Sequence, residues 1–182
     1  MEAKMIKLNV PYKSQLDNLF NPYGACNVTS VAMVIEFINP AVMLDVPNIN
    51  KTVQLEDVIY EEMEGLGLNR HVPSDLVKIM KVFNTKSVFK VNATIEEVVK
   101  HLNSELPCII HGYFTSFGHI VVVVGYDDTG LIVHDPYGEW FPDGYDTTAS
   151  GAYLHYSYDL IRRACAYDGE FWVHFIDGLN DE

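Results

Sequence analysis

The hydrophobic pattern of this 182-residue chain changes its period near the middle of the sequence. In the N-terminal part, apolar residues recur at intervals of three and four, which predicts helices over 25–38, 55–63, 74–83 and 94–103. In the C-terminal part, short runs of β-branched and aromatic residues predict strands over 107–113, 119–126, 131–134 and 171–176. Helices followed by antiparallel strands predict an α+β fold.

The ends of these segments carry signals of their own. The helix over 25–38 is apolar around most of its girth, so we expect it to be central and buried, and Asn39-Pro40 ends it. Thr94 and Glu97 have the spacing of a capping box, and the turn at 127–130 predicts a hairpin. The remaining expectations are a short strand or extended segment over 7–12, a helix over 158–164, and loops over 14–24 and 142–157. No repeat or break in composition divides the chain, so residues 1–182 are expected to form a single domain.

The composition narrows the classes of partner. The formal net charge is −13, which argues against nucleic acid and anionic membranes as partners, because both select basic surfaces. No long apolar stretch follows the first lysines, so we expect no signal peptide and a protein that is cytoplasmic on synthesis. The sequence pattern gives no indication of oligomeric state.

The three cysteines, Cys26, Cys108 and Cys165, are odd in number and widely spaced. This spacing favours neither a disulfide framework nor a zinc site, and no HExxH motif is present. We therefore expect no metal and no other cofactor.

Cys26 stands at the predicted start of the central helix, two residues after Gly24. Taken alone it fits a small buried residue better than a nucleophile, although a helix N-terminus lowers the pKa of a thiol. A reactive thiol needs an imidazole and a group that orients it. His119 opens the most β-rich strand, and His134 and Asp135 lie at the same end of the hairpin.

The hairpin register leaves two partners open for His119. Strands alternate faces, so only one of His134 and Asp135 can share the face of His119. A regular hairpin turning at Asp128 and Thr129 favours His134, and a bulge or a one-residue change in the turn favours Asp135. The chemistry favours Asp135, because a carboxylate accepts from an imidazole N–H and stabilises its cation.

Three stretches resemble the C39-like branch of the papain-like cysteine peptidases, which is related to bacteriocin-leader peptidases: VPYKSQLDN, GACNVTSVAM and GHIVVVVGYDDTGLIVHDPYG. The resemblance implies a papain-like fold, with an N-terminal helical half whose central helix carries the nucleophile and packs on a C-terminal antiparallel sheet. It also implies that Cys26 is the nucleophile, His119 the general acid/base and Asp135 its orienting residue. Gln15 would complete the oxyanion hole with the backbone N–H of Cys26. Asn27-Val28 follow the nucleophile where many relatives carry Gly-Pro.

The resemblance therefore predicts amide hydrolysis through an acyl-enzyme. The form of the motif is most similar to phage-type cell-wall hydrolases, so the favoured substrates are peptide or amide bonds of peptidoglycan, reached through a separate export or holin route. Expected substrate contacts are Gly24, Asn27, Gly118 and Trp140. The alternatives are an endopeptidase that cuts proteins or leader peptides, and a transglutaminase-like acyltransferase. The intact Cys26, His119 and Asp135 argue against a module that only binds.

Overall fold

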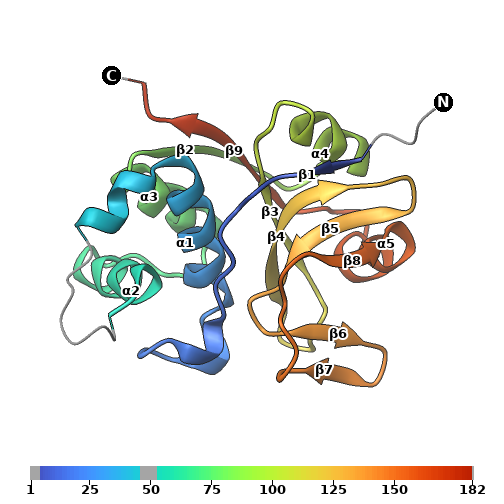
Figure 1. Ribbon diagram of the computed structural model, residues 1–182, viewed down its shortest axis with the longest axis horizontal. Coiled ribbons are helices and arrows are strands. Elements are labelled where there is room, and N and C mark those ends of the chain that lie inside the picture. Colours follow the sequence, from blue (N-terminus) through green and yellow to red (C-terminus); the bar gives the residue numbers. More distant parts are fainter. Residues whose placement is uncertain (1–4, 46–52, 182) are drawn as a thin grey trace.

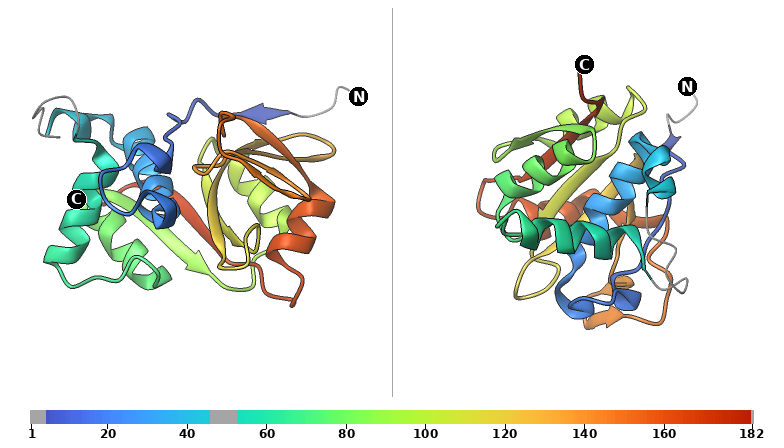
Figure 2. Two further views of the ribbon diagram at one scale, coloured as in Figure 1. Left: turned by 90° about the horizontal axis from the view of Figure 1, so that it is seen from below. Right: turned by 90° about the vertical axis from the view of Figure 1, so that its left-hand side faces the viewer.

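The fold combines a helical half with an antiparallel sheet. A computed structural model describes residues 5–45 and 53–181. Helices α1 (Cys26–Ile38), α2 (Leu55–Gly65) and α3 (Pro73–Val82) gather on one side of the molecule, and most of the sheet lies on the other with α4 (Ile95–Leu102) and α5 (Tyr158–Cys165), as Figures 1 and 2 show. The predicted α+β class is confirmed.

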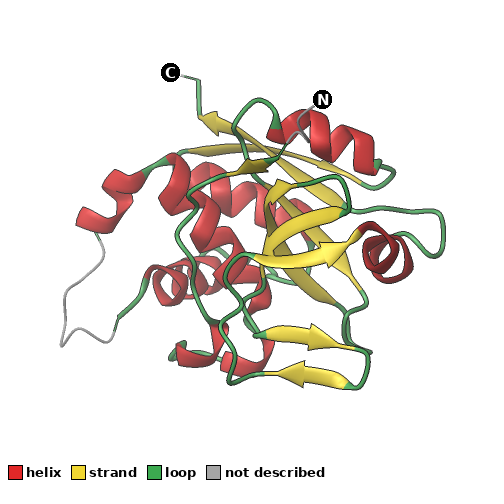
Figure 3. Ribbon diagram, turned by 45° about the vertical axis from the view of Figure 1, so that its right-hand side comes forward, coloured by secondary structure: helices red, strands yellow, loops and turns green. Residues whose placement is uncertain are grey.

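The main sheet has the strand order β2-β9-β3-β4-β5-β8, and β1 pairs with one end of β4. All pairs between these strands are antiparallel. Their bounds are β1 Ile6–Lys7, β2 Thr85–Lys90, β3 Cys108–Gly112, β4 His119–Tyr126, β5 Gly130–His134, β8 Leu154–Ser157 and β9 Val173–Leu179. A separate hairpin of β6 (Glu139–Phe141) and β7 (Gly144–Asp146) lies below the main sheet in Figure 3.

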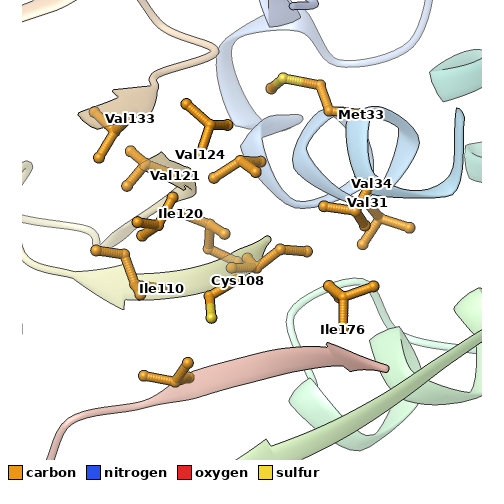
Figure 4. Packing of buried hydrophobic residues seen from close by; sticks show 14 of the residues in the cluster. Val31, Met33, Val34, Cys108, Ile110, Ile120, Val121, Val124, Val133 and Ile176 are labelled. Atoms are coloured by element: carbon orange, nitrogen blue, oxygen red, sulfur yellow. The ribbon is translucent and has the colours of Figure 1, made fainter. Parts of the chain in front are cut away.

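Helix α1 packs against β4, as its apolar girth predicts. Its residues from Asn27 to Ile35 are all buried. Figure 4 shows Val31 and Val34 of this helix above Ile176 of β9. Because fully burying a side chain of this kind stabilises a fold by roughly 1.5–3 kcal/mol, this contact fixes the helix against the sheet. The start of α1 is thereby held in place.

Most predicted elements are present with shifted ends. The capping box at Thr94 is formed, with the Glu97 backbone N–H donating to Thr94 Oγ1 over 3.1 Å and the Thr94 N–H donating to Glu97 Oε2 over 2.9 Å. The turn at 127–130 is held by Asp127 Oδ1, which accepts from the N–H groups of Thr129 and Gly130. Helix α3 begins at Pro73, one residue before the predicted start, because proline suits a first helical position.

The expected short strand or extended segment over 7–12 is a strand at Ile6–Lys7, after which the chain is extended, and the Leu8 N–H donates to the Val124 carbonyl over 2.7 Å. Two other predictions of local structure were wrong. The segment 142–157 is not a loop throughout, since it contains β7 and β8. The expected loop over 14–24 contains two short 3₁₀ turns, η1 (Gln15–Asp17) and η2 (Pro22–Gly24). Strand β2 was not predicted from the sequence.

Candidate active site

Cys26 is the first residue of α1, and its side chain is half-buried. The N-cap residue is Ala25, whose side chain can accept no hydrogen bond, and among the described residues the only first-turn N–H with a side-chain acceptor is that of Val28, which donates to Asn27 Oδ1 over 2.9 Å. The first N–H groups of an α-helix have no acceptor within the helix. The thiol of Cys26 therefore lies in the positive potential of a helix N-terminus.

The ring of His119 lies against the Cys26 thiol. His119 is the first residue of β4, and Ser30 Oγ of α1 donates to the carbonyl of the next strand residue, Ile120, over 3.3 Å. Burial raises the pKa of the Cys26 thiol, but the hydrogen bond to the His119 ring and its charge outweigh this effect and leave the pKa below its ordinary value. The helix and the strand thus bring an acidified thiol and an imidazole into contact.

Asp135 follows β5 directly and is completely buried. Its Oδ1 accepts from His119 Nε2 over 2.7 Å and from the Tyr137 backbone N–H over 3.0 Å. Its Oδ2 accepts from the hydroxyls of Tyr145, over 2.8 Å, and Tyr156, over 2.7 Å. Four donors therefore compensate the cost of burying this carboxylate.

The charge of Asp135 acts on the groups around it. Burial lowers the pKa of His119, but the charge of Asp135 and its hydrogen bond raise it to about 10. Burial and the Asp135 charge raise the pKa of both Tyr145 and Tyr156, so their hydroxyls stay protonated and donate. With Nε2 bonded to Asp135, the His119 ring has Nδ1 left for the thiol.

A β-bulge decides between the two partners that the sequence left open for His119. Val122 pairs with His134 and Val123 with Val133, but Gly125 pairs with Ile132, so the register shifts at Val124. Because Val122 and His134 share one face, His119 and Asp135 share the other. His134 Nε2 is hydrogen-bonded to the Val10 carbonyl over 2.8 Å, and its Nδ1 accepts from the Tyr153 N–H over 3.0 Å.

Gln15 lies beside this series and is 2 % exposed. Its backbone N–H donates to the carbonyl of Pro136, the residue after Asp135, over 2.8 Å. Its Nε2 donates to the carbonyl of Pro22 over 2.8 Å, which fixes the amide because a carbonyl oxygen only accepts. A primary amide carries two N–H donors, so one remains for a developing oxyanion.

These residues open onto a cleft of about 710 Å³. Gln15, Gly24, Cys26, Asn27, Gly118 and His119 all line it. Trp140 does not line the cleft, because its indole N–H donates to the Phe114 carbonyl over 3.0 Å and holds the ring against the fold. The cleft therefore brings together the expected substrate contacts apart from Trp140.

Sequence reasoning missed three side chains of this region. Tyr145 and Tyr156 lie in a segment whose irregular pattern predicts a loop. The only sequence signal for a role of these two residues is the high frequency of tyrosine in that segment. Arg70 lies between α2 and α3 and lines the cleft beside Asn27. Nothing in its local sequence distinguishes it from a solvated surface arginine.

The other two thiols differ from Cys26. Cys108 and Cys165 are buried, and burial raises the pKa of each. Within residues 5–45 and 53–181, no three His, Cys, Asp or Glu side chains are grouped as metal ligands would be. No helix in the described part of the chain is long and apolar enough to cross a membrane.

Comparisons with known proteins identify the fold and the family of this chain. A search of curated proteins finds no match. Among solved structures, a proposed C39-like peptidase from Bacillus anthracis is similar with a TM-score of 0.61 and 17% identity, covering 97% of this chain and 100% of that one. A double glycine motif protease from an AMS/PCAT transporter, solved with the leader peptide, has a TM-score of 0.50 and 16% identity, with 94% of each chain covered.

The two structural neighbours confirm the predicted papain-like, C39-type fold. The family model described as the Peptidase_C39 like family matches residues 7–166, most of the chain. The chain therefore belongs to the Peptidase_C39 like family of cysteine peptidases.

Proposed function

We propose that Cys26, His119 and Asp135 are the nucleophile, the general acid/base and the orienting residue of a peptidase that works through an acyl-enzyme. The observation that carries this proposal is the alignment of the thiol at the helix start, the His119 ring that lowers its pKa, and the buried Asp135 that is hydrogen-bonded to this ring. A lowered thiol pKa and a raised imidazole pKa favour the thiolate–imidazolium pair, which is the reactive form.

In the first half-reaction, the Cys26 thiolate attacks the carbonyl carbon of the scissile amide. The developing oxyanion accepts from Gln15 Nε2–H and from the backbone N–H of Cys26. Protonated His119 then gives its proton to the leaving amine, and the C–N bond breaks to leave a thioester on Cys26.

In the second half-reaction, neutral His119 takes a proton from water, which attacks the thioester carbonyl. The carbon–sulfur bond breaks, the carboxylic acid product leaves, and His119 is again protonated beside the thiolate. Throughout both steps Asp135 holds the ring through Nε2 and stabilises its cation.

For the substrate we propose peptide or amide bonds of peptidoglycan. Access to a polymer is supported by the open cleft, whose rim carries two exposed aromatic residues: Tyr23 is 80% exposed and Phe117 98%. Exposed aromatic rings of this kind pack against sugars and peptides. We further propose that an export or holin route brings the protein to the cell wall. We also propose that residues 1–182 act as one domain, supported by the shared core of helices and strands.

A second candidate is an endopeptidase that cuts a protein or a leader peptide. It is favoured by the similarity to a transporter protease solved with a leader peptide. An acyltransferase would use the same thioester but would replace water by an amine.

The test is mass spectrometry of fragments released from purified cell walls and from a casein-like protein, side by side, by the wild type and by Cys26→Ala. Soluble muropeptides from the wild type alone would support the cell-wall substrate. Casein fragments without muropeptides would reject it in favour of the endopeptidase. Addition of glycine methyl ester gives products joined to the amine if the chain is an acyltransferase.

A further inference from the structure

Arg70 is a cationic side chain placed beside the proposed nucleophile. Its Nη1 donates to the carbonyl of Gly24, two residues before Cys26, and lies 3.5 Å from Oδ1 of Asn27, the residue directly after Cys26. Its guanidinium carbon lies 5.5 Å from the centre of the Tyr60 ring. Both hydrogen-bond contacts use the same nitrogen, so Nε and Nη2 are left as donors.

The contacts of Arg70 are all neutral. Within the described residues, no carboxylate lies within ion-pair distance of its guanidinium, although the chain carries 25 acidic residues. Other cations of the chain do find such partners, among them Lys13 with Glu36 and Arg163 with Asp159. A half-buried guanidinium that faces a cleft without a carboxylate has capacity for one from a ligand.

The charge of Arg70 acts on its surroundings in the cleft. The neighbouring His71, which also lines the cleft, has its pKa lowered by burial and then by the positive charge of Arg70. Asp168 and Glu170 also line the cleft, and Glu170 Oε2 accepts from the indole N–H of Trp172 over 2.8 Å. A carboxylate entering the cleft is therefore attracted by Arg70 and repelled by these two acids.

We infer that Arg70 binds a carboxylate of the substrate close to the scissile bond, so that the enzyme prefers acidic peptides. This inference rests on the proposed peptidase function and names its substrate class. Because Gly24 and Asn27 lie within two residues of Cys26, the carboxylate belongs within about two residues of the cleaved bond, at about 3.8 Å per residue. An acidic side chain and the C-terminal carboxylate of a short peptide share this chemistry.

The experiment compares matched peptides in which one residue, Glu or Gln, is moved through the positions around the cleaved bond. All have amidated C-termini, and a further neutral pair has either a free or an amidated C-terminus. At one position the wild type should cleave the Glu peptide about 10-fold faster or more in kcat/KM, the effect of one charge-assisted hydrogen bond. A preference for the free C-terminus instead would identify the terminal carboxylate as the group bound.

The variants separate recognition from a structural role of Arg70. Arg70→Gln should bring the Glu-to-Gln ratio close to one while it retains turnover of the Gln peptide. Arg70→Lys keeps the positive charge but loses the planar guanidinium, so it should retain a smaller preference for the Glu peptide. The same variant tests the inference if Arg70→Gln does not fold. Arg163→Gln, which removes an ion-paired surface arginine, should leave the ratio unchanged.

Fluorescence anisotropy of the same peptides with Cys26→Ala measures the preference for Glu over Gln in binding, without turnover. Suppose that Cys26→Ala binds the Glu peptide more tightly, that adding Arg70→Gln removes this preference, and that the wild type cleaves none of the peptides. This result would support the role of Arg70 and reject the proposed function. The inference would be overturned if Glu and Gln peptides are bound and cleaved equally well and if the free and amidated C-termini also make no difference. An equal loss on both peptides in Arg70→Gln would also overturn it, because that is the signature of a purely structural contact.

Discussion

His119 Nε2 and Asp135 Oδ1 are 2.7 Å apart because of a β-bulge at Val124, five residues along β4 from the histidine. Without the extra residue the strand pair would present His134 to His119. The bulge therefore selects a carboxylate as the partner of the imidazole. His134 is turned to the other face, where it ties the N-terminal segment at Val10 to β5.

The pH dependence of activity should report this hydrogen bond. The active thiolate–imidazolium pair requires Cys26 deprotonated and His119 protonated. Since the pKa of His119 is raised to about 10, kcat/KM should fall as the pH rises past about 10. The acidic limb should lie below pH 9.0, the ordinary value for the thiol, because the pKa of Cys26 is lowered.

Asp135→Asn should move the alkaline limb to lower pH. The charge of Asp135 is the main influence that raises the pKa of His119, and an amide removes that charge. The measurement is kcat/KM across the pH range for both proteins. An alkaline limb that stays in place in Asp135→Asn would show that Asp135 does not support the imidazolium.

The tyrosine hydroxyls on Asp135 should contribute to activity without contacting substrate. Tyr145→Phe and Tyr156→Phe each remove one hydrogen bond to Oδ2, worth about 1.5–3 kcal/mol for a charged acceptor. Each variant should lose about 10-fold or more in kcat and shift its pH profile. Tyr153→Phe is the control, because its hydroxyl donates to Asn9 Oδ1 at the surface, away from Asp135. Losses confined to thermal stability would contradict the role.

Gln15→Ala should lower kcat by about 10²–10³-fold with little change in KM, the usual cost of removing one oxyanion donor. Gln54→Ala is a matched control, since the Gln54 amide donates to the Asp17 carbonyl at the surface. Circular dichroism would check that the loss of the Pro22 contact leaves the fold intact. A rise in KM at constant kcat would assign Gln15 to substrate binding instead.

The three thiols should differ in their reaction with iodoacetamide. Cys26 should be alkylated near neutral pH, because its pKa is lowered and its side chain is half-buried. Cys108 and Cys165 should stay unmodified in the folded chain, since both are buried with raised pKa. Peptide mapping by mass spectrometry gives the site. Faster labelling of either buried thiol would contradict the assignment.

Much of this fold follows from local sequence signals. The apolar girth of α1, the capping box at Thr94 and the Asp127 turn each predict an element that is present. These signals work because a helix face, a cap and a tight turn depend on neighbours within a few residues. Strands β7 and β8 lie in a segment with little period, and β8 is defined by its pairing with β5.

The candidate site could be predicted only in part. The order of Gln15, Cys26, His119 and Asp135 carries the family resemblance, and the structure places these four residues together. The choice of Asp135 over His134 depends on a bulge that no local residue signals. Tyr145, Tyr156 and Arg70 reach the site through tertiary contacts between segments far apart in the chain.

The most direct test of the account is the rate of hydrolysis by Cys26→Ala, measured beside Cys165→Ala, which removes another cleft thiol. On the substrate identified by the cell-wall and casein comparison, Cys26→Ala should lose at least about 10⁴-fold in kcat, as expected when a nucleophile is removed. Cys165→Ala should retain turnover. Hydrolysis by Cys26→Ala at the wild-type rate would contradict the central claim that this thiol forms the acyl-enzyme.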